Sequence, residues 1–434
     1  MSHLLAMYQG VEDLINGVET PGEGGAGEGG EHLENVGEAV VEAVKVEVAE
    51  AVAEIEQVAQ EVETLRTEVE GHEERVDELH EEVAGMESML ASGNFQPSAF
   101  AHSYNKARRL NAKLGGKDFA VIGAESISDA STARVSAVTG MEGFMATVKA
   151  GAGKAIEFIK HIFNTVINFF IGIASATTAL DRRRTQLAKR LEGNKLKDTI
   201  KLGAWNVGWD YEGGGWKALG QFMNSPFNDI LGGALPAFID TTKSMETIDK
   251  AKFKTAYTKL IDDIKGVAKG VAGAVAEKGD PTNRTVIGQH AGARVFVHYY
   301  DKFEEENDIL VAARTIKVSF GKTEEAKKFS TGEVKNKVSM AELKSALGGA
   351  ADYIDAVREN KIQQKFSKAE RDRVIASMNL AARKQDEKNK EASGKGVQLI
   401  RAVYATSSSL TTTLNNYYLR VAKQMMDAVS AHLA

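Results

Sequence analysis

The chain has 434 residues, only five prolines and no cysteine. This length can bury a sizeable core over two or three domains. Because proline interrupts helix interiors, its scarcity favours long helices. The absence of cysteine excludes disulfide frameworks, thiolate metal sites and cysteine nucleophiles, and an intracellular, reducing compartment fits best. We expect no secretory signal, since the N-terminal segment has neither a basic stretch nor a long apolar run.

The net charge of -6 conceals two parts of opposite sign. Residues 1–125 contain 26 Asp and Glu against 8 Lys and Arg, a net of -18, whereas the remainder contains 46 Lys and Arg against 34 Asp and Glu, a net of +12. Such asymmetry is typical of a chain in which one part meets a polyanion or an acidic partner while the other part neutralises, repels or delays that contact. The alternative is that both parts are solvated surfaces, and charge alone does not choose between the two.

Residues 1–30 predict a short helix followed by a glycine-rich hinge. An acidic coiled-coil arm is expected over residues 31–90, where apolar side chains recur at heptad spacing from Val41 to Leu90. That spacing predicts a coiled coil or a long helix docked through one narrow stripe. The flanking positions are mostly Glu, so a parallel self-pair would bring like charges together. A basic partner surface, such as the chain's own body, suits the arm better.

Residues 91–140 are expected to form a linker, because Gly93 and Pro97 interrupt the heptad pattern and small residues follow. Exposed linkers of this kind are preferred sites of proteolysis. In this segment Glu125 ends a Gly-Ala-Glu tripeptide and precedes Ser126, at the point where the charge balance changes. The same small-x-Glu pattern also occurs elsewhere in the chain, at Gly85-Met86-Glu87 and Gly140-Met141-Glu142.

Residues 141–434 predict a basic helical body whose most apolar stretch lies near its start. Residues 162–180 contain no charged side chain over 19 positions, which reaches the length of a transmembrane helix. Asn, Ser and Thr side chains interrupt this stretch, so a central core helix is favoured over a membrane span.

The hydrophobic period changes several times along the body. Residues 203–236, with all three tryptophans, predict an irregular packed segment, and residues 247–277 predict a helix. At about 285–320 apolar side chains alternate, which predicts a small antiparallel β insertion. A last helix over 397–433 is expected to close the bundle. The predicted fold is therefore mainly α: a helical bundle body with a small antiparallel β insertion, preceded by a long acidic coiled-coil-like helix.

The sequence contains no pattern typical of an enzyme or a metal site. A zinc-protease HExxH pattern and a GxSxG nucleophile elbow are both absent. The segment 151–155 resembles a phosphate loop only superficially, because Val148 replaces the first glycine and Ala155 the Ser or Thr. We therefore expect a protein that is not an enzyme, with no catalytic, cofactor-binding or metal-binding residues and no cofactor.

One basic run is a candidate binding site. It consists of Arg182, Arg183, Arg184, Lys189 and Arg190. Such a run could contact phosphates independently of sequence, by releasing counterions. The alternative is the C-terminal part of a helix, where cations interact favourably with the helix dipole.

In composition and order, the chain resembles the internal head proteins of large contractile-tailed bacteriophages. The resemblance is strongest over residues 154–191, continues through the β-rich insertion and the closing helix, and covers about residues 140–434. It implies a non-enzymatic virion structural protein that is made in the host cytoplasm and packed inside the phage head. It also implies an acidic N-terminal propeptide that enters the procapsid core together with other head or core proteins.

The resemblance further implies that a phage prohead protease removes this propeptide by cutting after a small-x-Glu sequence. Glu125 before Ser126 matches that pattern best, and Glu87 before Ser88 is the alternative. Before DNA is packaged, the arm would mask the basic body. After cleavage, the body would tolerate or bind double-stranded DNA non-specifically and could leave the head with the genome.

Two other classes of function remain open from the residues. A membrane-active helical or pore-forming protein would insert residues 162–180 while the acidic arm restrains it. A scaffold adaptor would instead use the coiled coil to select its partners.

Overall fold

The computed structural model describes the chain except for residues 1–29, 92–94, 124–129, 202–228, 244–248, 270–275, 291–292, 323–331 and 385–389. The chain divides into two units, residues 1–43 and residues 44–434. Helix α2 (Gly30–Ala91) begins in the first unit and continues into the second. The short helix and hinge expected before it lie outside the described residues.

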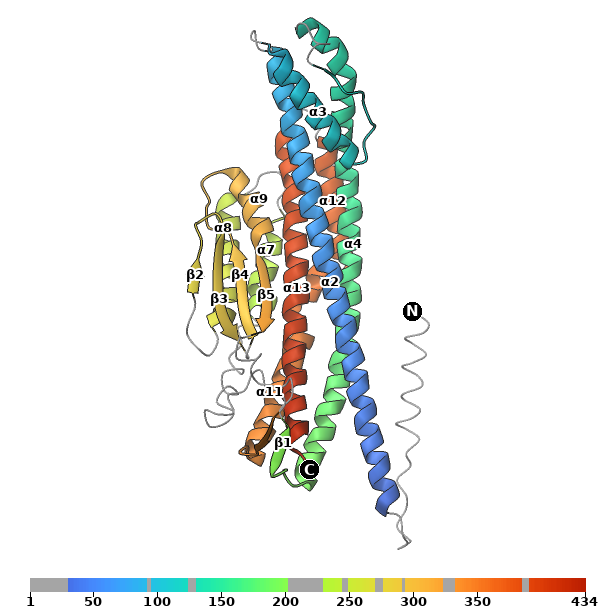
Figure 1. Cartoon of the computed structure of the whole chain (residues 1–434), viewed down its shortest axis with the longest axis vertical. Helices are drawn as coiled ribbons and strands as arrows, with labels where there is room; N and C mark the ends of the chain where they lie inside the picture. The colour runs from blue at the N-terminus through green and yellow to red at the C-terminus, as the bar shows by residue number, and fades with distance from the viewer. Residues whose placement is uncertain are drawn as a thin grey trace. The chain divides into compact units, whose positions relative to one another are not determined.

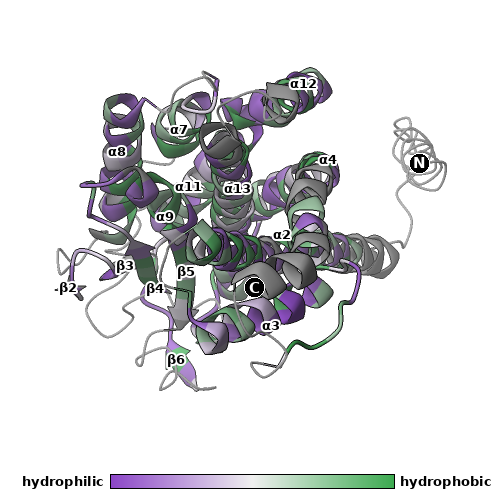
Figure 2. Ribbon diagram, turned by 90° about the horizontal axis from the view of Figure 1, so that it is seen from above, coloured by the Kyte–Doolittle hydropathy of each residue, from purple (hydrophilic) through white to green (hydrophobic). Residues whose placement is uncertain are grey.

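Three long helices form the framework of this unit. They are α2, α4 (Ala130–Gly193) and α13 (Lys390–His432). All three run side by side along its long axis, and α13 is the most deeply buried (Figure 1). Seen end on, α13 lies among α2, α4 and two further helices of the body (Figure 2). These two are α11 (Met340–Glu359) and α12 (Lys368–Lys384). The mainly helical fold, including the long acidic helix and the closing helix, is confirmed.

A four-stranded antiparallel sheet packs beside α13. Its strands, in the order β2-β3-β4-β5, are β2 (Ala276–Lys278), β3 (Arg284–His290), β4 (Ala293–Tyr299) and β5 (Lys317–Lys322). Helix α8 (Lys250–Lys269) covers one face of the sheet, and α9 (Glu306–Thr315) connects β4 to β5 (Figure 1). The small antiparallel insertion is therefore confirmed, although the sequence did not predict the helix within it.

The helix expected over residues 247–277 is wrong at its C-terminal end. Helix α8 ends at Lys269, and residues 276–278 form strand β2 instead. The end of α8 crosses β3 so closely that a Cβ on Gly288 would lie 1.8 Å from the Ala268 carbonyl oxygen. After this crossing the chain returns along β3 and pairs with it as a strand. The helical spacing of the apolar residues gave no sign of that pairing.

The segment expected to be a linker contains helix α3 (Pro97–Lys113). Proline in the first turn of a helix loses no hydrogen bond, so Pro97 begins a helix rather than interrupting structure. Helix α3 lies against the C-terminal end of α2 and the N-terminal part of α4 (Figure 1). The three helices share a small second core, in which the Tyr104 and Phe144 rings lie 5.3 Å apart.

The remaining described elements are short. They are β1 (Thr199–Lys201), η3 (Ile230–Ala234), α7 (Leu235–Asp240), β6 (Glu333–Lys335) and η4 (Lys361–Phe366). Strands β1 and β6 pair antiparallel as a separate two-stranded sheet. The tryptophan-rich part of residues 203–236, up to residue 228, lies outside the described residues.

The apolar stretch of α4 lies inside the unit. Within the described part of the chain, one helix segment, Ile156–Gly193, is long and apolar enough to cross a membrane, and half of its most apolar window is buried. Phe163, Val166 and Phe169 are fully buried in the main core. This placement is that of a core helix, the interpretation favoured from the sequence.

Candidate functional site: the interface between arm and body

We call residues 44–91 of α2 the arm and residues 130–434 the body. The apolar heptad of the arm faces the body. Val48, Ile55 and Val62, each seven residues apart, are at most 1% exposed, and the heptad positions between them are half-buried. The arm approaches α4 closely, since a Cβ on Gly172 would lie 3.6 Å from Ile55 Cγ1. The stripe is therefore covered by the chain's own body, as one of the two alternatives for this pattern predicted.

Carboxylates beside this stripe form ion pairs with basic side chains of the body. The pairs are Glu47 with Arg182 at 3.3 Å, Glu56 with Arg420 at 3.2 Å, Glu61 with His161 at 3.9 Å, Glu63 with Lys317 at 2.6 Å and Asp77 with Arg314 at 3.6 Å. The basic partners come from α4, α13, β5 and α9. The acidic arm thus neutralises basic groups contributed by four separate elements of the body. The His161 pair adds charge only when the imidazole is protonated.

Glu63 is the most enclosed of these five carboxylates. Its oxygens accept hydrogen bonds from Lys317 Nζ and, at 2.8 Å, from Ser409 Oγ on α13. Burial alone would raise the pKa of this carboxyl, but the hydrogen bonds from Lys317 and Ser409 and the charge of Arg66 outweigh it. The pKa of Glu63 therefore lies below its usual value. The carboxylate stays ionised where the arm meets β5 and α13.

Arg66 reverses the charge pattern of the arm. Its side chain is buried, and Nη2 donates a 2.6 Å hydrogen bond to the Arg314 carbonyl oxygen in the last turn of α9. The neighbouring Ala313 carbonyl oxygen accepts a 2.7 Å hydrogen bond from Thr406 Oγ1 on α13. The last four carbonyl groups of a helix have no partner within it, and the arm and α13 together satisfy two of those of α9. Sequence reasoning missed this role, and the only signal was a basic residue in an acidic helix.

The two candidate cleavage positions differ in their surroundings. Glu125 and Ser126 lie outside the described residues. Glu87 and Ser88 lie on α2 with exposed side chains, directly after the buried Met86. A protease acting at Glu87 would have to unwind a helix whose neighbouring residues are packed into a core, whereas exposed loops are cut more readily.

The structure divides the basic run into two parts. Arg182 pairs with Glu47 of the arm, Arg183 is buried in a 2.6 Å ion pair with Asp427, and Arg184 pairs with Asp181 at 3.2 Å. Lys189 is exposed and Arg190 half-exposed, and neither forms an ion pair with any residue the structure describes. Of the five residues of the run, Lys189 and Arg190 are therefore the two whose charge has no acidic partner among the described residues.

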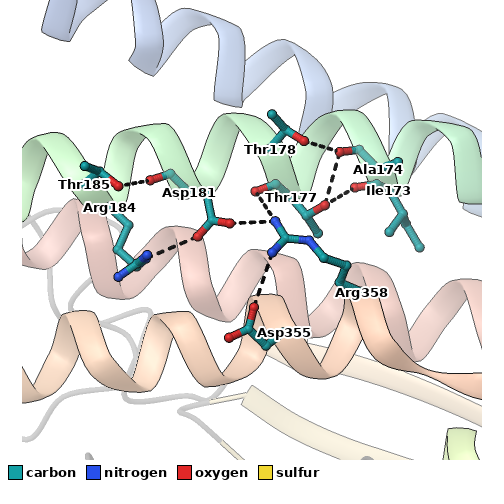
Figure 3. Close-up of polar contacts among 9 residues, drawn as sticks. All are labelled: Ile173, Ala174, Thr177, Thr178, Asp181, Arg184, Thr185, Asp355 and Arg358. Atoms are coloured by element: carbon teal, nitrogen blue, oxygen red, sulfur yellow. Dashed lines mark hydrogen bonds and ion pairs between the residues drawn. The ribbon is translucent and has the colours of Figure 1, made fainter.

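Asp181 shows what the paired arginines do structurally. Its carboxylate is held by Arg184 from its own helix and, at 2.6 Å, by Arg358 Nη2 from α11 (Figure 3). Arg358 also contacts Asp355 and the Thr177 carbonyl oxygen (Figure 3). This network fixes α11 against α4, so Arg184 belongs to a contact within the body.

No three His, Asp or Glu side chains converge on a metal-sized site within the described ranges. Comparisons with curated proteins and with solved structures gave no significant match. A family model described as phiKZ-like phage internal head proteins matches residues 50–431, which include most of the arm and nearly all of the body. The chain therefore belongs to the family of phiKZ-like phage internal head proteins.

Proposed function

We propose that this internal head protein is packed as a helical structural component whose acidic arm neutralises a basic surface of the body, and that a maturation protease cuts the chain after Glu125. The observation that carries the proposal is the set of five ion pairs between arm and body. Residues 44–91 contain 15 Asp and Glu against 3 Lys and Arg, a net of -12. The net of +12 on residues 126–434 equals this charge with the opposite sign.

The family resides inside the phage head, where the protein meets other head or core proteins. In that setting a neutralised body would not attract nucleic acid or acidic proteins prematurely. Once the arm no longer covers them, basic side chains such as Arg420 and Lys317 would be available to phosphates of packaged double-stranded DNA. Such contacts release counterions and need no particular base sequence. Lys189 and Arg190 would add to this surface.

Two considerations support Glu125 over Glu87 as the cleavage position. The Glu87 peptide bond lies in a helix between the packed residues Met86 and Met89. Glu125 follows residues 116–123, which are neither helix nor strand. We further propose that the protein acts through assembly and charge rather than catalysis, which agrees with the structural role of its family.

The intact masses of the protein from its native particle test the cleavage. Fragments ending at Glu125 and beginning at Ser126 are expected, and the protein from unprocessed proheads is expected at full length as the control. A mature particle that holds only the 434-residue chain would overturn the propeptide proposal, and fragments divided after Glu87 would move the site.

A further inference from the structure

The segment before the candidate cut is attached to the body at two separate places. The first is the main core, where Val48, Val52, Ile55 and Val62 are buried together with residues of α4 and α13. The second is the small core at the far end of the arm, which α2 and α3 share with α4. Both attachments precede Glu125 in the sequence, so both would belong to the fragment that cleavage creates.

The second attachment depends on glycines of α4. A Cβ on Gly140 would lie 2.4 Å from Tyr104 Oη, and a Cβ on Gly143 would lie 2.2 Å from Phe119 Cζ. The Phe119 ring also meets the Phe144 ring edge to face at 5.2 Å. Bare helix backbone thus lets two aromatic rings of the segment lie directly on α4. The surface of α4 at Gly140 and Gly143 is therefore complementary in shape to the rings of the segment, as expected of a specific interface.

The apolar contacts and the ion pairs of the arm respond differently to salt. Exposed ion pairs contribute little to stability and weaken as salt is added, because the screening length falls from about 8 Å at 0.15 M to about 3 Å at 1 M. All five arm carboxylates that pair with the body are at least 35% exposed, so their ion pairs are of this kind. Burial of apolar side chains is not screened. Affinity for the body therefore comes mainly from the stripe and the aromatic contacts, whereas the carboxylates set the charge.

We propose that the body carries a binding surface for residues 44–123 that keeps them bound after the chain is cut. The inference rests on the proposed function only for the place of the natural cut. Cleavage would then produce a complex of two fragments in which the basic body stays covered. Its exposure to DNA would require a second step that displaces or degrades the arm.

The experiment replaces residues 124–129 of the full chain with a recognition sequence for a site-specific protease. The folded protein is cut and passed through a sizing column at 0.15 M and at 1 M NaCl, and each peak is identified by mass. We expect both fragments to elute together at both salt concentrations. Separation at 0.15 M would overturn the proposal, and separation at 1 M alone would show that ion pairs hold the arm and would overturn it equally.

Two substitutions of one residue type provide the matched comparison. Val62→Asn places a polar group at a position that is 1% exposed, whereas Val46→Asn changes a valine of the same helix that is 50% exposed. In the cut protein, Val62→Asn should raise the dissociation constant of the fragment about tenfold or more, and Val46→Asn should leave it unchanged. Equal effects would contradict attachment through the stripe. Because the cut is engineered, the result does not depend on whether the native chain is processed.

Discussion

At the scale of single residues, Arg66 differs from every other charged residue of the arm for which the structure describes the side chain. It is 4% exposed, and besides its hydrogen bond to Arg314 it pairs with Glu70 of its own helix at 2.9 Å. A guanidinium is weakly hydrated for a cation and offers several donors in one plane. It can therefore enter the interface while satisfying a carbonyl group that another element leaves without a partner.

Arg66→Ala should lower the free energy of unfolding by about 1–3 kcal/mol, since the partly buried Arg314 carbonyl oxygen would lose this donor. Urea titration followed by circular dichroism measures the change. Arg75→Ala makes the same substitution at an exposed position of the same helix and should change stability by less than about 0.5 kcal/mol. Similar losses in both variants would contradict the capping role of Arg66.

Glu63 gives a prediction for pH. Its pKa is lower in the folded protein than the ordinary 4.5, so ionisation stabilises the folded state above that value. The contribution is lost as the pH falls below 4.5 and through the lowered pKa of the folded state. The stability difference between the wild type and Glu63→Gln should therefore be largest near neutral pH and should shrink towards pH 4 and below. Glu50→Gln, at an exposed arm position, is the control and should show little difference throughout.

At the scale of elements, the arm combines two functions on separate faces of one helix. The apolar stripe binds the body, and the carboxylates beside it cancel basic charge. The stripe was predictable from heptad spacing, but its partner was not, because the same spacing also fits pairing between two chains. Only the fold brings Arg182, Lys317 and Arg420, which are distant in sequence, to one side of the arm.

The charge function can be tested in the full chain by substituting three paired carboxylates, Glu47→Gln, Glu56→Gln and Glu63→Gln. The matched variant substitutes Glu50, Glu54 and Glu68, which are exposed and make no ion pair with a described residue. Both variants change the net charge equally. The interface variant should bind double-stranded DNA more tightly, and its slope of log K against log salt should steepen by up to about 2.7, or 0.9 for each cation freed to meet a phosphate. Identical binding by the two variants would show that net charge alone matters.

Other elements show where sequence reasoning stops. The heptad pattern predicts a break at Pro97, although proline at the start of a helix is favourable, and the segment that follows it forms α3. The sequence predicts the end of α8 too late, because i,i+4 spacing of apolar residues does not reveal that the helix ends at Lys269, where it crosses Gly288 of β3. The strand-rich composition of residues 294–299 and 315–320 did indicate the sheet, since β-branched and aromatic residues alternate there.

At the scale of the whole molecule, the mainly helical fold and the family could be predicted from the sequence. Both follow from the order of the segments along the chain, which is an acidic helix, a junction, a basic helical body and a closing helix. The candidate site was reachable only in part. In the basic run, Arg183 forms an ion pair with Asp427 and Arg184 forms one with Asp181. These contacts exist only once α4 has formed and α13 has packed against it. The opposite charges of the two parts are visible in the sequence, but the sequence does not show that residues 44–91 pack against the basic body within one compact unit.

Because the arm and α13 share one core, we expect them to open together when the unit unfolds locally. Val48, Ile55 and Val62 of the arm belong to the same buried cluster as Val403 and Leu414 of α13. In hydrogen exchange, amides around Val48 to Val62 should therefore be protected by a free energy close to that of α13, and this protection should not fall between 0.15 M and 1 M salt. Amides of a separately attached arm would exchange through a low-energy opening, and protection that collapses at high salt would mean that charge holds the arm. If protection persists at 1 M salt, the apolar stripe is what holds the arm on the body. The ion pairs then control whether the basic side chains of the body are available to anions.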